Sequence, residues 1–169
     1  GEGAIAEAAQ ATLAALQAPE VDEAIVELLE NGDKELRVVL LDLIGQRRIT
    51  SAGPALRKAA AEQDKMVRMA AIRALGQTIG LDGVTVLTAR VVDPESPEEV
   101  DAVIAALKSA CRRMPDRDAC AEKLVDSMDD ASVEAQCRLL DVFSALGGEK
   151  ALKSVAANAQ SSNATIRAA

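Results

Sequence analysis

Residues 64–76 read DKMVRMAAIRALG, and this stretch decides the fold. Its first residue, Asp64, suits a helix N-cap because its carboxylate can accept a hydrogen bond from a backbone N–H of the first turn. Gly76, at the other end, favours a helix stop. The apolar residues between them recur at intervals of three and four, which predicts an amphipathic helix. They are Val67, Ala70, Ala71, Ala74 and Leu75.

The pattern of an apolar residue followed by a charged one returns along the whole chain, at intervals of 31, 33, 33 and 33 residues. A unit this short cannot bury its apolar face alone, so the repetition predicts units that stack on one another. The apolar positions are Leu36, Val67, Val100, Val133 and Ile166. The charged residues that follow them are Arg37, Arg68, Asp101, Glu134 and Arg167.

Each unit is expected to be a pair of helices, because turn-forming glycine and proline residues interrupt it near its middle and at its end. We predict one domain over residues 1–169 with no internal boundary. Residues 163–169 repeat the opening of the unit that begins at Asp64, so we expect a longer parent chain. The predicted helical pairs cover residues 3–30, 34–63, 65–92, 97–129 and 131–160.

Apolar residues at i, i+4 and i+7 predict the inward positions of the next first helices. In the fourth and fifth units this places Val100, Ile104 and Leu107, then Val133, Cys137 and Leu140, on the apolar faces of the first helices. The second helices of these two units are expected to carry Leu124 and Leu152. Because Leu146 and Gly147 arrive late in this scheme, the first helix of the fifth unit is predicted to be longer than the others. The charged residues that follow the repeated apolar positions alternate in sign at two places. This predicts ion pairs between units, Arg68 with Asp101 and Glu134 with Arg167.

The charge of the chain is unevenly distributed around a net value of −8. Residues 1–33 hold eight acidic and no basic residues, residues 34–90 hold ten basic and five acidic ones, and residues 91–135 hold twelve acidic and five basic ones. Trp and Tyr are absent and Phe143 is the only aromatic residue, so stacking on bases or sugars is not expected. Recognition is therefore predicted to depend on charge and shape.

Residue types needed for common catalytic and metal sites are missing. The chain has no His, no CxxC pair and no glycine-rich phosphate loop, so we predict a protein that is not an enzyme and that uses no cofactor or metal. The acidic cluster of Asp126, Asp129 and Asp130 lacks the further oxygen ligands that calcium requires. The cysteines are expected to be buried small side chains, and a Cys111–Cys120 bridge is left open for an oxidising compartment.

Residues 33–45 (DKELRVVLLDLIG), 64–76 and 163–169 (NATIRAA) together resemble the HEAT repeat consensus, in the short bacterial form related to phycobilin lyase repeats. The resemblance implies an all-α, right-handed α-solenoid of about five stacked helical hairpins, truncated in a following repeat. It also implies a concave face, formed by the second helices, that binds a protein partner. Carried over by position, the residues of that face are Arg57, Lys58, Glu62, Arg90, Glu122, Lys123, Lys150 and Lys153.

The leading prediction is therefore a protein-interaction scaffold or accessory domain of a larger bacterial protein. A nucleic-acid binder is the first alternative, although the acidic net charge and the lack of aromatic residues argue against it. Its basic residues would be Arg47, Arg48, Arg57, Lys58 and Arg90. A bilin lyase or lyase chaperone is the second alternative. We expect no membrane insertion and favour a monomer, and the sequence is compatible with a cytoplasmic, periplasmic or secreted parent.

Overall fold

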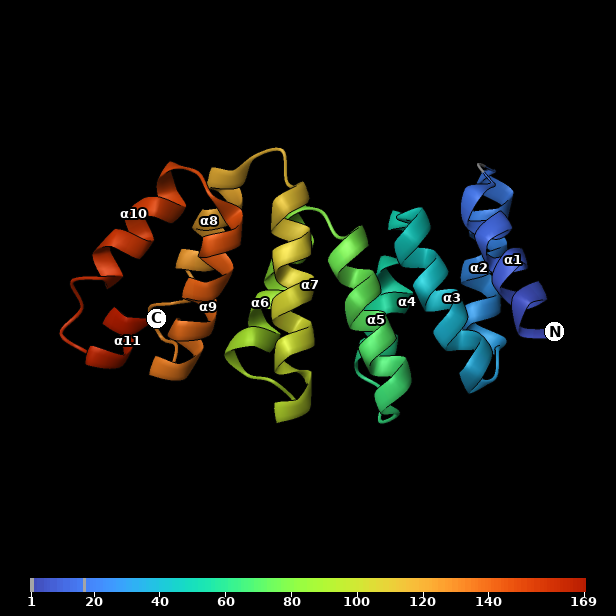
Figure 1. Cartoon of the computed structure of the whole chain (residues 1–169), viewed down its shortest axis with the longest axis horizontal. Coiled ribbons are helices and arrows are strands. Elements are labelled where there is room, and N and C mark those ends of the chain that lie inside the picture. Colours follow the sequence, from blue (N-terminus) through green and yellow to red (C-terminus); the bar gives the residue numbers. More distant parts are fainter. Residues whose placement is uncertain (1, 17) are drawn as a thin grey trace. The chain divides into compact units, whose positions relative to one another are not determined.

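The computed structural model describes residues 2–16 and 18–169, and all regular structure in these ranges is helical (Figure 1). The helices form two compact units, Gly1–Thr78 and Ile79–Ala169, and each is described below by itself.

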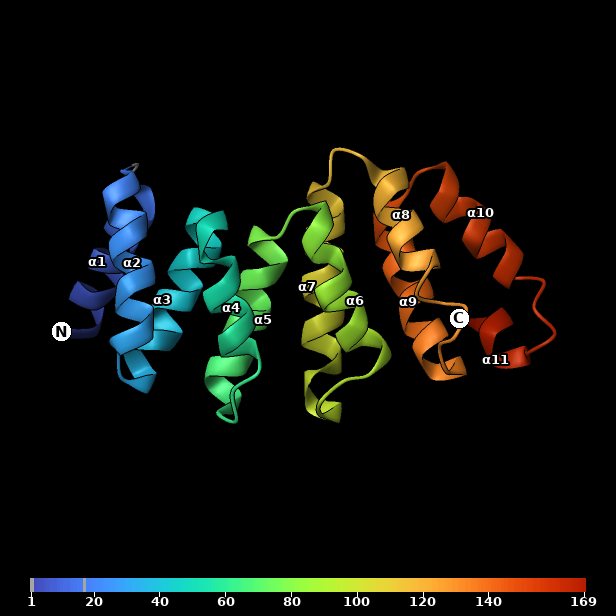
Figure 2. The same cartoon turned by 180° about the vertical axis from the view of Figure 1, so that it is seen from behind.

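The first unit contains five helices, seen from its two sides in Figures 1 and 2. The first helices of successive hairpins pack on each other, α1 on α3 and α3 on α5, while the second helices α2 and α4 pack beside them. The large side chains between these layers are fully buried, among them Leu41, Ile44 and Leu75. The helices are α1 (Glu2–Ala15), α2 (Pro19–Asn31), α3 (Lys34–Arg47), α4 (Gly53–Ala60) and α5 (Lys65–Thr78).

The second unit repeats this arrangement. The first helices α7, α9 and α11 pack on one another in sequence order, and the second helices α6, α8 and α10 contact each other on the other side (Figure 2). Leu107, Leu124 and Leu139 are fully buried between the two layers. The helices are α6 (Val84–Val92), α7 (Val100–Arg113), α8 (Arg117–Val125), α9 (Val133–Leu146), α10 (Glu149–Asn158) and α11 (Ala164–Ala168). The prediction of an all-α fold of stacked hairpins is confirmed.

The predicted helix starts at the acidic residues are also confirmed. The Asp33 side chain accepts a hydrogen bond from the Leu36 backbone N–H at 2.9 Å, and Asp64 accepts from Val67 at 3.1 Å. The predicted glycine stops are wrong, because α3 and α5 continue past Gly45 and Gly76. A Cβ at Gly45 would lie 3.3 Å from the Ala74 Cα, so this glycine permits close packing of α3 on α5.

The constant 33-residue interval does not hold in the second unit. The segment between α6 and α7 is long, and it ends in a short 3-10 turn over Pro97–Glu99 that delays the start of the α7 apolar face. The buried residue at the position of Val67 is therefore Val103, three residues after the predicted Val100, which is half-buried. In α9 it is Ala135, two residues after Val133, which is 38% exposed.

Three further predictions are corrected by the structure. Ile104 and Cys137 are half-buried rather than core residues. Helix α9 has 14 residues, as α3, α5 and α7 do, so it is not longer than the other first helices. In α10 the buried residue is Ala151, and Leu152 is 68% exposed, although Leu124 of α8 is fully buried as predicted.

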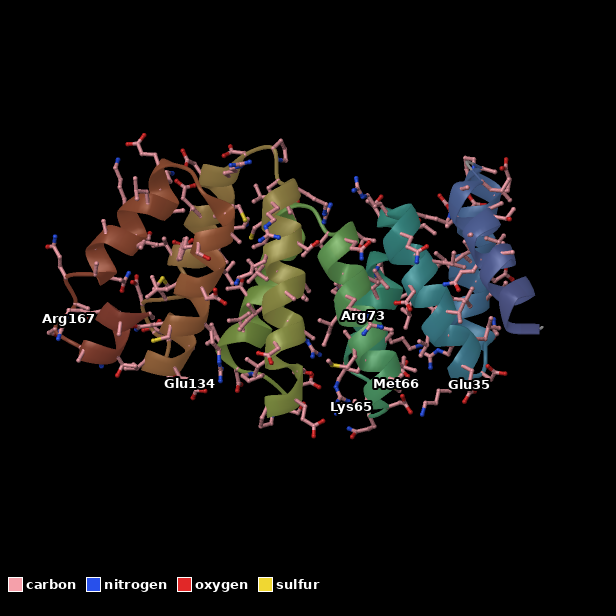
Figure 3. The ribbon with its side chains drawn as sticks, in the orientation of Figure 1. Glu35, Lys65, Met66, Arg73, Glu134 and Arg167 are labelled. Atoms are coloured by element: carbon pink, nitrogen blue, oxygen red, sulfur yellow. The ribbon has the colours of Figure 1, made fainter. Side chains whose placement is uncertain are left out.

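The predicted ion pair between Glu134 and Arg167 is replaced by other contacts, and Figure 3 shows these two side chains apart, on α9 and α11. Glu134 pairs with Arg138 at 2.5 Å, one turn along α9. The Arg167 guanidinium donates to the carbonyl oxygen of Ser161 at 2.6 Å. Ion pairs between successive first helices occur further along these helices, between Arg73 and Asp42 at 3.3 Å and between Lys108 and Asp141 at 2.6 Å.

Candidate binding groove

Two adjoining hollows lie between the second helices α8 and α10, within the second unit. Their volumes are about 260 and 290 Å³, and Val125 and Ser154 line both of them. We call this surface the α8–α10 groove. The first hollow is also lined by Glu122, Asp126, Lys150 and Lys153, and the second by Met128, Asp129, Gln136, Ala157 and Asn158.

The turns that precede α8 and α10 position the walls of the groove. The Asp116 carboxylate caps α8 by accepting from the Ala119 N–H at 2.8 Å. Gly147 and Gly148, with φ values of 67° and 93°, make the turn into α10, a backbone conformation that glycine adopts without strain. Asp118 of α8 then accepts from the Lys150 backbone N–H at 3.2 Å, which ties the start of α10 to α8.

The charges along the groove are unequal. Glu122 of α8 forms an ion pair with Lys150 of α10, and Lys153 pairs with Glu149 on its own helix at 2.6 Å. Asp126 and Asp129 are exposed and, within the described part of the chain, form no ion pair. Since the two lysines are neutralised by glutamates, the groove keeps an excess of negative charge at the C-terminal end of α8.

The floor of the groove is partly apolar. Met128 is only 7% exposed, and Val125 is half-buried at the point where the two hollows join. An apolar floor with a charged rim is typical of surfaces that bind another polypeptide.

The structure brings together three of the residues predicted for the second-helix face. Glu122, Lys150 and Lys153 line the α8–α10 groove. Lys123 is half-buried on α8 outside the lining of either hollow. In the first unit, Arg57 and Lys58 are exposed on α4.

Glu62 and Arg90, also predicted for this face, are held in structural contacts. Glu62 accepts two hydrogen bonds from the Arg37 guanidinium, at 2.9 and 2.5 Å. These bonds raise the pKa of Arg37 and lower the pKa of Glu62 below its usual value. The Arg90 side chain is 13% exposed and pairs with Glu99, which is fully buried, at 3.1 Å and with Glu95 at 2.8 Å.

Sequence reasoning missed Val125, Asp126, Asp129 and Ser154 as parts of a binding surface. From the sequence these two aspartates are candidates only for a cation site, and among the described residues no group of three or more acidic, Cys or His side chains could hold a metal ion. Their positions at the end of α8, one turn apart, were the sequence signal that could have placed them on one surface.

The part of the chain that the structure describes has no helix with the length and apolar character needed to cross a membrane.

The basic residues of the nucleic-acid alternative do not form one exposed patch. The Arg47 side chain is 5% exposed, pairs with Asp22 at 2.5 Å and donates to the Leu16 carbonyl oxygen. The Arg90 guanidinium is paired with Glu95 and Glu99. Phe143, the single aromatic residue, is buried in α9 and is not available to stack on a base or a pigment.

Stacked helical hairpins with an open groove on their second helices define an α-solenoid repeat protein. The family model for HEAT repeats matches residues 21–108, which is just over half of the chain. The chain therefore belongs to the HEAT repeat family. Comparison with curated proteins finds no match. HEAT repeats commonly serve as protein-interaction scaffolds and are typically non-catalytic.

Proposed function

We propose that this chain is a non-catalytic protein-binding domain that holds its partner on the second-helix face, with the α8–α10 groove as the principal site. The observation that carries the proposal is the pair of adjoining hollows, which share Val125 and Ser154 and run along two successive second helices. A continuous surface of this kind suits an extended or helical segment of another protein better than a small molecule, because each hollow, at about 260 and 290 Å³, is smaller than the pockets of about 300–1,000 Å³ that enclose small ligands.

The charge of the groove sets the chemistry of the partner. Asp126 and Asp129 stand at the rim without ion pairs, while the lysines opposite are neutralised. The partner segment is therefore expected to carry Lys or Arg side chains beside an apolar side chain that reaches Val125. Because the contact is between exposed charges, its affinity should fall as salt concentration rises.

The test is affinity capture from a lysate of the source organism, followed by mass spectrometry and by measurement of binding to the captured protein. The double variant Asp126→Lys and Asp129→Lys should lose at least about tenfold in affinity, which corresponds to one lost charge contact of ordinary strength. Lysine at the C-terminal end of α8 also suits the helix dipole, so the variant should remain folded.

The matched control is Asp101→Lys, which reverses an exposed charge on the first helix α7 of the same unit. It should bind as the unchanged protein does. Equal loss of affinity in both variants, or no loss in either, would remove the α8–α10 groove as the binding site. Capture of no protein above background would remove the scaffold function.

A further inference from the structure

Two cysteines lie in contact where α7 meets α8. Cys111 is near the C-terminal end of α7 and Cys120 is in the middle of α8. Their Sγ atoms are 3.1 Å apart, and both residues are fully buried. The contact is close to the distance at which the two atoms could be covalently joined, since a disulfide bond has an S–S length of about 2.05 Å.

The local backbone holds this pair in place. The Met114 N–H donates to the Cys111 carbonyl oxygen at 3.2 Å at the end of α7, and the Cys120 N–H donates to the Asp116 carbonyl oxygen at 3.3 Å in the first turn of α8. Both cysteines therefore belong to hydrogen-bonded helical turns on either side of a short connection. Joining their sulfur atoms requires an approach of about 1 Å, from the contact at 3.1 Å to a bond of about 2.05 Å.

We propose that Cys111 and Cys120 are a redox-active pair that closes into an intrachain disulfide in an oxidising environment. The inference depends on the contact between the two thiols and not on the proposed binding function. The third cysteine supplies a contrast, because Cys137 is half-buried on α9 and its sulfur contacts the Thr165 carbonyl oxygen at 3.9 Å.

The oxidant is a low-molecular-weight disulfide such as oxidised glutathione. The Cys120 thiolate attacks one sulfur of this molecule, which forms a mixed disulfide and releases one glutathione thiolate. Cys111 then loses its proton and attacks the Cys120 Sγ, which forms the Cys111–Cys120 bond and releases the second glutathione thiolate. The two cysteines lose two electrons and two protons, and the oxidant is reduced to two thiols.

The environment of the pair favours this order of attack. In the folded protein, the hydrogen bond between the two thiols raises the pKa of Cys111 and lowers the pKa of Cys120, which makes Cys120 the better nucleophile. Because both thiols are buried, the oxidant reaches them when the α7–α8 hairpin opens or before it has folded. During folding this hydrogen bond is absent, so either cysteine can attack first, and the product is the same disulfide.

The proposed disulfide fixes one wall of the second-helix surface. It would join α7 to α8, the helix that carries Val125 and Asp126, and it would limit the freedom of the unfolded chain between residues 111 and 120. The thermal midpoint of the oxidised protein should therefore be higher than that of the reduced protein by roughly 5 °C or more.

The experiment refolds the reduced, denatured chain in a buffer of oxidised and reduced glutathione, alkylates the remaining thiols under denaturing conditions and digests the protein with trypsin. Cleavage after Lys108, Arg112, Arg117 and Lys123 places the two cysteines in separate peptides, 109–112 and 118–123. We expect mass spectrometry to find these two peptides joined by a disulfide, with Cys137 alkylated.

Two variants serve as controls. Cys137→Ser should form the same linked peptides, and Cys120→Ser should show no linked peptides and no effect of oxidation on its thermal midpoint. Should Cys120→Ser fail to fold, peptide mapping of the unchanged protein still decides the matter. The proposal is overturned if peptides 109–112 and 118–123 are both alkylated after oxidative refolding, or if either is joined to the peptide that contains Cys137.

Discussion

Arg68 and Gln136 occupy the same position of their repeats, and both donate hydrogen bonds to the carbonyl oxygens that precede their own helix. The Arg68 guanidinium reaches the Glu62 and Gln63 carbonyls at 2.8 and 3.0 Å. The Gln136 amide reaches the Met128 and Ala131 carbonyls at 3.2 and 3.0 Å. The repeated polar residue therefore donates hydrogen bonds to carbonyl groups in the turn that follows the preceding second helix.

The first prediction concerns this position. Arg68→Met should lower the free energy of unfolding by about 1–3 kcal/mol, because the carbonyl oxygens would lose charged donors in a partly buried turn. Urea denaturation measures the change. The control, Arg73→Met on the same helix, removes a side chain that is 50% exposed and makes one ion pair at 3.3 Å, so it should cost no more than about 1 kcal/mol. Equal effects of the two substitutions would contradict the role assigned to Arg68.

This repeated position also shows which helix starts could be predicted from the sequence. In α3, α5 and α11 the motif is complete, with an N-cap at Asp33, Asp64 or Asn163 and an arginine four residues later. There the helix starts were predictable. In α9 the same functions belong to Ser132 and Gln136, which share chemistry but not charge with the motif.

The shift in register in the second unit could not be predicted from periodicity. It depends on the long connection before α7, where Glu99 is buried and bound to Arg90. A buried glutamate in a proline-containing, acidic segment resembles an exposed turn when only its composition is considered.

The α8–α10 groove was also only partly predictable. The residues opposite each other on α8 and α10 are defined by packing, and the exposed faces of α-helices show no periodic signal of their own.

The second prediction concerns the buried ion pair that fixes this connection. Glu99 accepts from Arg90 at 3.1 Å and from the Glu95 backbone N–H at 2.9 Å. Glu99→Ala should destabilise the protein by about 3 kcal/mol or more, because it leaves the arginine charge without its buried partner. Glu95→Ala removes the partner that is 51% exposed and should cost less than about 1 kcal/mol. Thermal and urea denaturation of both variants check the difference, and similar costs would show that burial of Glu99 is unimportant.

The third prediction is a pH dependence. The hydrogen bonds from Arg37 lower the pKa of Glu62 below 4.5, so the folded protein binds fewer protons at this site than the unfolded chain does. The stability that the pair supplies is therefore present above pH 4.5 and is lost as the pH falls through the folded-state pKa. Glu62→Gln should cost about 1–2 kcal/mol at pH 7 and nearly nothing at about pH 2.

Denaturation series at both pH values measure this change, and Glu23→Gln, at an exposed residue of α2, controls for general effects of charge. A cost for Glu62→Gln that stays constant across the pH range would contradict the assigned coupling to Arg37.

The last prediction separates the core from the surface of the second helices. Leu124 of α8 is fully buried, whereas Leu152 of α10 is 68% exposed. Leu124→Ala should lower the free energy of unfolding by about 2–5 kcal/mol, because it removes apolar contacts and leaves a cavity. Leu152→Ala should change it by less than about 0.5 kcal/mol, as substitutions at exposed sites do. Both leucines are predicted from the sequence to lie on second helices, so equal costs in a urea titration would contradict the difference in burial. Unequal costs in the stated direction are expected because α10 carries Ala151 inward, with 2% of that residue exposed.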